Sequence, residues 1–223
     1  MMIRNVVFVG AGDAVGRRVS ADLTARGCTV CNILLPGQAG QGILLDPLSP
    51  DSIRSAAARV AEKMPAADML VMNLDCSDHS DRASILDQLD FEEMLRDYQY
   101  NAVGPAAVLY GFRPLLDRGE GKRVCVITTA EGSNNACRET GGFGRRMSRA
   151  ALNMAMNLEF NGLRPLGYTM RMYCRDLQAS GSEIGAYAAE YFLRNRSNEV
   201  ESWKHSDENR LVLRDAYARE LPW

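Results

Sequence analysis

The chain has 223 residues and a formal net charge of -2, from 26 Lys and Arg against 28 Asp and Glu. This length can bury one large core and the composition does not shift along the chain, so we expect a single domain over residues 1–223. The balanced charge provides no excess of positive charge that would attract nucleic acid or an anionic membrane. No apolar run approaches the ~20 residues needed to cross a bilayer. We therefore expect a cytoplasmic protein whose partners are small molecules.

Short apolar runs alternate with longer amphipathic segments, which is typical of βαβ units around a parallel sheet. The pattern predicts strands over residues 3–9, 28–35, 68–73, 122–128 and 167–174, with a short strand within 210–223. It predicts helices over residues 14–26, 50–63, 90–98, 102–116, 143–161 and 185–194. Ser49 before Pro50, and Asp90 with Glu93, are helix-start signals. The predicted fold class is α/β.

Two patterns look like metal sites, and we interpret neither as one. Cys28 and Cys31 form a CxxC, but residues i and i+3 of a strand point to opposite faces, and only His79 and His205 are available to complete a zinc site. The segment 75–81 (DCSDHSD) has the composition of a solvated loop. Neither histidine lies in the context of a catalytic nucleophile, so a hydrolase is not supported.

The sequence GAGDAVG places Gly10, Gly12 and Gly16 between a predicted strand and a predicted helix. In this context glycines form a tight turn and let the N–H groups of a helix N-terminus approach a pyrophosphate. Taken alone, the spacing also fits a tight βα turn with no ligand.

The order of features resembles the short-chain dehydrogenase/reductase family over essentially the whole chain, most closely its sniffer-like, carbonyl-reductase-type branch. The resemblance rests on GAGDAVG, LLDPLSPDSI, LVMN, YNAVGPA, GEGKRVCVITT, RRMSRAALNMA and the terminal ELPW. It implies a Rossmann-type doubly wound parallel sheet with a dinucleotide at the carboxyl ends of the strands. It also implies a homodimer or homotetramer that associates through the helical segments 90–116 and 143–161.

The resemblance carries the family's catalytic and cofactor positions onto this chain. The catalytic positions are Asn101, Thr129, Arg145 and Arg149, of which the last two replace the family's Tyr and Lys. The cofactor-binding positions are Gly10, Gly12, Ala14, Gly16, Asp46 and Asn73. Since arginine is effectively never deprotonated and has no acceptor, Arg145 can stabilise an oxyanion but cannot act as the acid.

Other departures from the family pattern add bulk or charge where the family places bare backbone against the cofactor. Ala14 replaces the middle glycine of the loop, Leu74-Asp75 replaces the Ala-Gly that follows Asn73, and Arg175-Asp176 replaces a Pro-Gly.

The cofactor prediction is NAD(H) in preference to NADP(H). Leu34 and Leu35 follow the second strand, where dinucleotide binders carry an acid for the ribose or an arginine for the 2′-phosphate. Asp13 in the glycine loop would repel a 2′-phosphate, and Asp46 matches the family's adenine contact. The missing ribose acid leaves open that the protein binds neither cofactor.

Three functional hypotheses follow. In the first, the protein is a catalytically inactive pseudoenzyme with a ligand-binding or regulatory role, and Arg145 and Arg149, at i and i+4 on one helical face, bind a carboxylate or phosphate. In the second, it is an NAD(P)-dependent oxidoreductase that uses an unconventional proton donor such as Tyr173. In the third, it is a structural partner of an active paralogue.

Each candidate residue also has a purely structural interpretation. Arg145, Arg146 and Arg149 could form a solvated face paired with Glu139 or Asp176. Likewise, Tyr173 could be a core aromatic, and Asn101 could serve only to support its helix.

Overall fold

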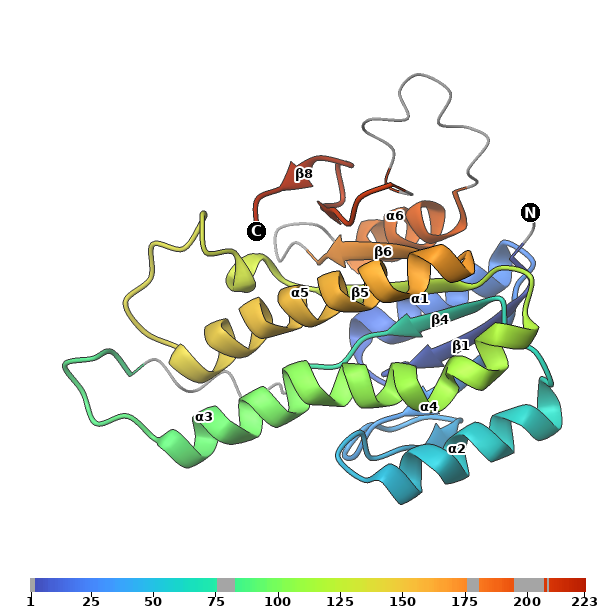
Figure 1. Cartoon of the computed structure of the whole chain (residues 1–223), viewed down its shortest axis with the longest axis horizontal. Helices are drawn as coiled ribbons and strands as arrows, with labels where there is room; N and C mark the ends of the chain where they lie inside the picture. The colour runs from blue at the N-terminus through green and yellow to red at the C-terminus, as the bar shows by residue number, and fades with distance from the viewer. Residues whose placement is uncertain (1–2, 76–82, 176–180, 195–206, 208) are drawn as a thin grey trace.

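An eight-stranded sheet runs through the protein (Figure 1). The computed structural model describes residues 3–75, 83–175, 181–194, 207 and 209–223. The strands are β1 (Asn5–Val9), β2 (Thr29–Leu34), β3 (Ile43–Leu44), β4 (Met69–Met72), β5 (Arg123–Thr128), β6 (Thr169–Cys174), β7 (Leu213–Arg214) and β8 (Glu220–Leu221). Their order is β3-β2-β1-β4-β5-β6-β7-β8, and each neighbouring pair is parallel except β7 with β8. This order confirms the predicted Rossmann-type doubly wound sheet.

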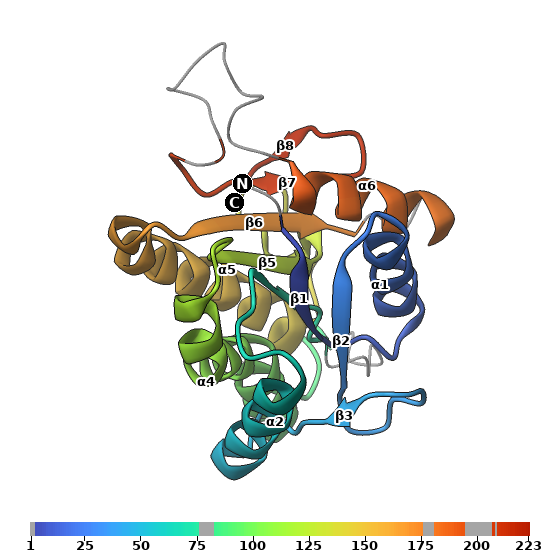
Figure 2. The same ribbon diagram turned by 90° about the vertical axis from the view of Figure 1, so that its right-hand side faces the viewer.

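Helices cover both faces of the sheet (Figure 2). One layer contains α1 (Ala14–Ala25) and α6 (Gly181–Leu193), which pack against each other. The other contains α2 (Pro50–Lys63), α4 (Gly104–Arg118) and α5 (Phe143–Leu163), and α3 (Phe91–Tyr98) packs against α5. Short helical segments occur at η1 (Gln99–Val103), η2 (Ala130–Gly132) and η3 (Arg164–Leu166).

The central strands were readable in the sequence because helices bury them on both sides. Every residue of β4, β5 and β6 is buried, as expected for parallel strands between two helical layers. The predicted helix starts are confirmed: the Ser49 side chain accepts a hydrogen bond from the Ser52 N–H, and Asp90 accepts from the N–H groups of Glu92 and Glu93.

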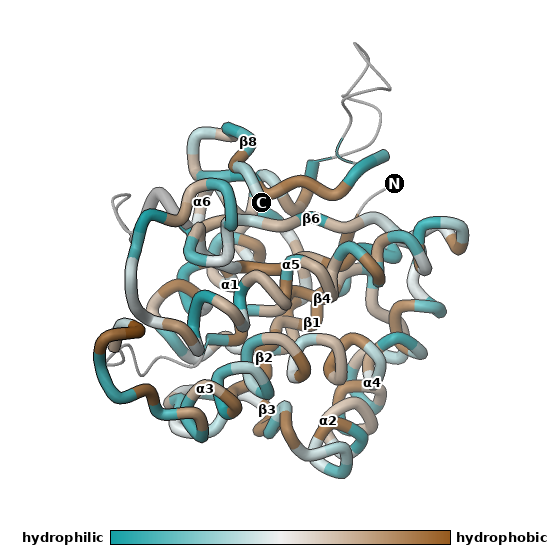
Figure 3. The backbone as a smooth tube through the Cα atoms, turned by 60° about the vertical axis from the view of Figure 1, so that its left-hand side comes forward, coloured by the Kyte–Doolittle hydropathy of each residue, from teal (hydrophilic) through white to brown (hydrophobic). Residues whose placement is uncertain are grey.

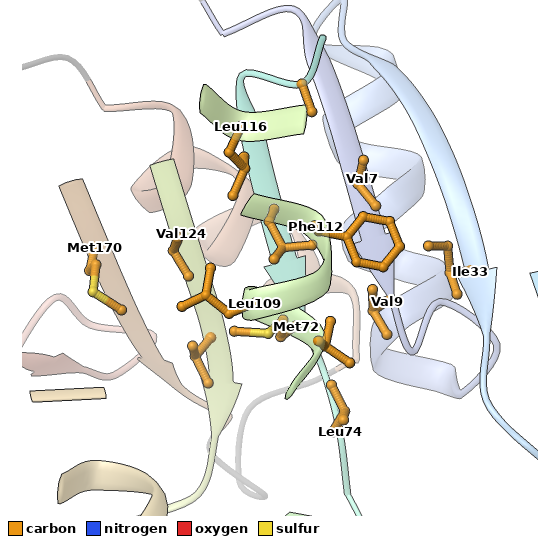
Figure 4. Close-up of a cluster of buried hydrophobic side chains, with 14 of the residues drawn as sticks. Val7, Val9, Ile33, Met72, Leu74, Leu109, Phe112, Leu116, Val124 and Met170 are labelled. Carbon is orange, nitrogen blue, oxygen red and sulfur yellow. The ribbon is translucent and has the colours of Figure 1, made fainter. Parts of the chain in front are cut away.

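Alternate residues of the strands feed two hydrophobic clusters, one on each face. Val7 and Val9 of β1 pack with Phe112 of α4 on one side (Figure 4), whereas Val6 and Phe8 pack toward α1 and α6 on the other. Segments rich in hydrophobic residues accordingly lie in the centre of the molecule, where the strands run (Figure 3). Cys28 belongs to one cluster and Cys31 packs against the other, so the CxxC pair is split by the sheet as predicted.

Four parts of the fold differ from the sequence prediction. The single short strand expected within 210–223 is a pair of two-residue strands, β7 and β8, that run antiparallel. Strand β3 was not predicted, because its two residues are too few to show a pattern. The helices expected over 90–98 and 102–116 are joined by the π-helical segment η1, in which the Gly104 N–H donates to the Gln99 carbonyl. The next residue, Pro105, has no N–H for a regular helical bond, and the wider turn accommodates it. Helix α6 starts at Gly181, four residues earlier than predicted. The sequence did not indicate this first turn, because glycine and serine are weak helix formers.

Within the residues that the structure describes, no helix is long and apolar enough to cross a membrane.

Candidate functional site

The carboxyl ends of the central strands meet at one edge of the sheet, next to α5. The strand order reverses between β1 and β4, and open α/β sheets bind ligands in the crevice at such a reversal. The chain leaves β1 at Gly10, β4 at Asn73 and β5 at Thr129. The predicted site residues Gly10, Asn73 and Thr129 therefore converge here, although they are far apart in the sequence.

Close packing within the chain already requires glycine at two positions of the turn after β1. Gly10 has a φ of +84°, and a side chain there would collide with the Asn73 carbonyl oxygen. A side chain at Gly16 would likewise collide with the Gly10 carbonyl. These two glycines let β1, β4 and the start of α1 approach closely, so they are needed with or without a ligand. Ala14 is the first residue of α1.

Several donors of this turn already have partners within the chain. The Gly16 N–H donates to Oδ1 of Asp13, the N-cap of α1, at 2.6 Å. The Asn73 side-chain amide donates to Oδ2 of Asp13 and to the Gly10 carbonyl, both at 3.0 Å. The Gly12 N–H donates to Oε1 of Gln38 at 3.1 Å. Asp13 and Gln38 thus supply the acceptors that a bound phosphate would otherwise provide.

A buried ion-pair network lies beyond the ends of β4 and β6. The carboxylate of Asp75 is paired with both Arg149 of α5 and Arg175, which directly follows β6. The side chains of Arg149 and Asp75 are 1% and 7% exposed. Arg149 also donates to the Leu74 carbonyl at 3.1 Å, and Nη1 of Arg175 lies 3.8 Å from Oδ2 of Asp13. Burial lowers the pKa of Arg175, against the opposing effect of the Asp13 charge.

Arg145 belongs to a second, more open pair. Its Nη2 lies 3.0 Å from Oε1 of Glu131 in η2, with the two side chains 16% and 28% exposed. The Thr129 hydroxyl donates to the other Glu131 oxygen at 3.3 Å. Glu131 was missed by the sequence analysis, although its position three residues after the end of the buried strand β5 was a usable signal.

Asn101 lies deeper in the protein. It is fully buried in η1, where its side-chain amide donates to the Ser148 hydroxyl of α5 at 3.0 Å. The Ser148 hydroxyl in turn donates to the Arg145 carbonyl at 3.0 Å. These bonds tie η1 to the first turns of α5, which supports a structural contribution from Asn101.

The remaining predicted residues lie away from these pairs. Asp46 is exposed after β3, and its Oδ1 accepts a hydrogen bond from the Leu48 N–H at 2.9 Å. Leu34 and Leu35 are buried. Tyr173 is 1% exposed and packs edge-on against Phe192 in the cluster on the α1 and α6 side. Tyr173 is therefore a core aromatic, and its proposal as a proton donor is wrong.

The solvated-face interpretation of the arginines is wrong for Arg149, which is buried. Arg146 does pair with Glu139, with 4.0 Å between Nη2 and Oε2. Asp176 and residues 76–82 lie outside the described residues. Among the described residues, no group of three His, Cys, Asp or Glu side chains could hold a metal ion.

The strand order, the glycine turn and the placement of α5 define a protein with the short-chain dehydrogenase/reductase fold. Solved structures of this family cover 99% of the chain, and the chain covers all of each. They include the carbonyl reductase Sniffer of D. melanogaster (TM-score 0.80, 15% identity) and a carbonyl reductase from Pseudomonas aeruginosa PAO1 (0.74, 19%). A short-chain dehydrogenase/reductase from Burkholderia multivorans with bound NADP is also similar (0.73, 17%).

Two curated proteins are similar in sequence. The C-signal of Myxococcus xanthus is 39% identical over 83 residues, which are 37% of this chain and 50% of that protein. The 1-hydroxy-2-glutathionyl-2-methyl-3-butene dehydrogenase of Rhodococcus sp. (strain AD45) is 31% identical over 159 residues, which are 67% of this chain and 66% of that protein. The chain therefore spans between half and two thirds of these relatives. No family model matches the chain. The resemblance to the short-chain dehydrogenase/reductase family is confirmed by the structural neighbours together with the similarity to a dehydrogenase.

Proposed function

We propose that this chain is a non-classical protein of the short-chain dehydrogenase/reductase type, with a ligand-binding or regulatory role and without the family's Tyr–Lys chemistry. The observation that carries this proposal is the state of Arg149. At the family's lysine position it is buried, paired with Asp75 and bonded to a backbone carbonyl. Arg145, at the tyrosine position, cannot donate and recover a proton near neutral pH. The loss of a positioned general acid alone costs roughly 10²- to 10⁴-fold in rate.

The names of the two curated relatives point in different directions. The C-signal, 39% identical over 37% of this chain, is not named as an enzyme, whereas the relative that is 31% identical over 67% of this chain is named as a dehydrogenase. The NADP-bound neighbour supports a nicotinamide dinucleotide as the ligand class of this fold. Of the two cofactors, NADP(H) is the less compatible with this chain, because Asp13 would repel a 2′-phosphate and buried Leu34 and Leu35 offer it no cation.

A small anion is the alternative ligand. A cavity of about 410 Å³ beside the start of α5 is lined by residues that include Glu131, Arg146 and Met147. An anion there would have to compete with Glu139 for Arg146, and Glu131 in the lining would repel it. We expect only weak binding, because the Arg146 guanidinium already has a carboxylate partner.

The second candidate function is oxidoreduction with Glu131 as the proton-transferring group. The observation that favours it is the position of the Glu131 carboxylate, next to the Thr129 hydroxyl and partly exposed. A carboxylate can exchange protons with a substrate hydroxyl, which arginine cannot do.

The test is an assay of NADH and NADPH oxidation with a panel of aldehydes and ketones. The unmodified protein should show no turnover above the blank. Turnover that disappears in Glu131→Gln, but survives in Glu62→Gln at an exposed position of α2, would establish the second candidate instead. Turnover that depends on neither glutamate would contradict both candidates.

We further propose that the protein forms a homodimer through α5 and the helix that runs from α3 to α4. These helices lie side by side on one face of the molecule (Figure 1). They carry large apolar side chains that are about half to four-fifths exposed, namely Phe91, Leu95, Tyr98, Tyr110, Met147, Met154 and Leu158. If each side chain contributes on the order of 100 Å², the exposed apolar area is about 700 Å². A standard interface buries about 800 Å² per partner.

Analytical ultracentrifugation tests the dimer. The unmodified chain should sediment as a dimer, and Met154→Glu with Leu158→Glu should convert it to a monomer with an unchanged circular dichroism spectrum. The matched control is Leu44→Glu, because Leu44 is 66% exposed but lies on strand β3. A monomeric unmodified chain would contradict the proposal.

A further inference from the structure

Charged side chains of alternating sign line the carboxyl edge of the sheet. The sequence of contacts is Arg149 to Asp75, Asp75 to Arg175, and Arg175 to Asp13. These residues come from α5 and from the segments that follow β4, β6 and β1. The chain of contacts therefore crosses the crevice in which this fold class binds a dinucleotide.

The glycine turn is the first place where the fit of a dinucleotide can be tested. Its diphosphate would lie against the N-terminus of α1, where N–H groups and the helix dipole favour an anion. In this chain the Asp13 carboxylate already caps that end and accepts from the Gly16 N–H. An arriving diphosphate would meet a like charge at close range, which opposes binding.

Gln38 adds a second obstruction at the same turn. Its side-chain oxygen accepts from the Gly12 N–H and the Leu35 N–H, both at 3.1 Å. The Gln38 Cβ lies only 2.6 Å from where a side chain on Gly12 would begin. The Gly12 N–H, which a phosphate would need as a donor, is therefore already bonded within the chain.

The far end of the crevice is also filled. Leu74 and Asp75 are buried there, and Asp75 holds two arginines. Displacing Asp75 to admit a ligand would leave the buried Arg149 without its carboxylate, and an uncompensated buried charge is strongly unfavourable. The residues present do not fit a dinucleotide at either end.

We infer that the side chains of Asp13, Gln38 and Asp75 occupy the dinucleotide crevice of this protein, and that it folds and functions without a bound dinucleotide. The inference deepens the proposed function, on which it rests for the location of the crevice. Asp13 takes the place of the diphosphate at the glycine turn, and Asp75 fills the space between α5 and the end of β6.

Calorimetric titration with NADH, NADPH and ADP-ribose tests this inference. The unmodified protein should bind none of the three with a dissociation constant below about 1 mM. Asp13→Ser combined with Gln38→Ala should bind ADP-ribose at least about tenfold more tightly than the unmodified protein, because the substitutions remove the like charge and free the Gly12 N–H to donate to a phosphate. Serine retains an N-cap oxygen, so α1 keeps its capping group.

The matched control combines Asp51→Ser, at an exposed position in the first turn of α2, with Gln88→Ala at another exposed position. This control should show no gain in affinity. If the double variant does not fold, Gln38→Ala alone, in a loop, should still show a measurable gain.

A dissociation constant below about 1 mM for any of the three ligands on the unmodified protein would overturn the inference. The absence of any gain in affinity for ADP-ribose in the folded variants would overturn it as well. A protein that binds NADH but does not oxidise it would overturn this inference and leave the proposed function intact.

Discussion

Replacing Asp75 should destabilise the protein more than replacing Arg149, although the two residues form one ion pair. Asp75→Ala removes the carboxylate that pairs with both Arg149 and Arg175, and the Arg149 side chain is 1% exposed. Breaking a buried pair in this way costs about 3–5 kcal/mol. Arg149→Met costs less, about 1–2 kcal/mol, because Asp75 keeps its contact with Arg175. For a chain of this length, 1 kcal/mol corresponds to about 2–4 °C in Tm, so the first variant should melt roughly 6–20 °C lower.

A double-mutant cycle measured by urea denaturation isolates the pair. Asp75→Ala with Arg149→Met should be less destabilising than the sum of the two single changes by at least about 1 kcal/mol. The exposed pair of Arg54 with Asp51, with side chains 70% and 86% exposed, is the control, and its coupling should stay below about 0.5 kcal/mol. Equal and small effects of both single variants, with no coupling, would refute the buried network.

Three further predictions concern the scaffold. Asp68→Ala should destabilise the fold by about 3 kcal/mol or more in urea denaturation, because its carboxylate accepts from four backbone N–H groups at 2.9–3.3 Å; a cost near zero would contradict this assignment. Gly10→Ala should cost more stability than Gly167→Ala, because both have a φ near +85° but only Gly10 has backbone in the way; equal melting temperatures would contradict the packing argument. Burial raises the pKa of Asp207, but the hydrogen bonds and charge of Arg214 outweigh it and hold the pKa below its usual value. The destabilisation caused by Asp207→Asn should therefore be full above about pH 5 and shrink as the pH falls below about 4; a pH-independent cost would be inconsistent with this coupling.

The sequence predicted the parts of the fold whose signal is local. Strand β4, with the sequence MLVM, is buried on both faces, so it appears as a continuous apolar run. The caps at Ser49 and Asp90 were recognisable because capping needs a particular side chain within three residues of the N–H it bonds. The continuity from α3 through η1 to α4 was not recognisable, since Gly104 and Pro105 normally interrupt a helix.

The site was harder to predict, because its contacts join distant segments. Arg149 and Arg175 meet at Asp75 only because β4 and β6 flank β5 in the sheet, which depends on the strand order. Charged residues are also mostly exposed, so burial of Arg149 runs against the ordinary expectation. The departures at Leu74, Asp75 and Arg175 could be recognised as bulk and charge in the crevice, but not as partners of the arginine on α5.

The most direct test of the account is an experimental structure of the unmodified protein, crystallised in the presence of excess NADH. The account predicts a crevice without dinucleotide, in which Asp75 lies between Arg149 and Arg175 and Asp13 caps α1. A dinucleotide bound along the glycine turn, with Asp75 displaced from Arg149, would contradict it.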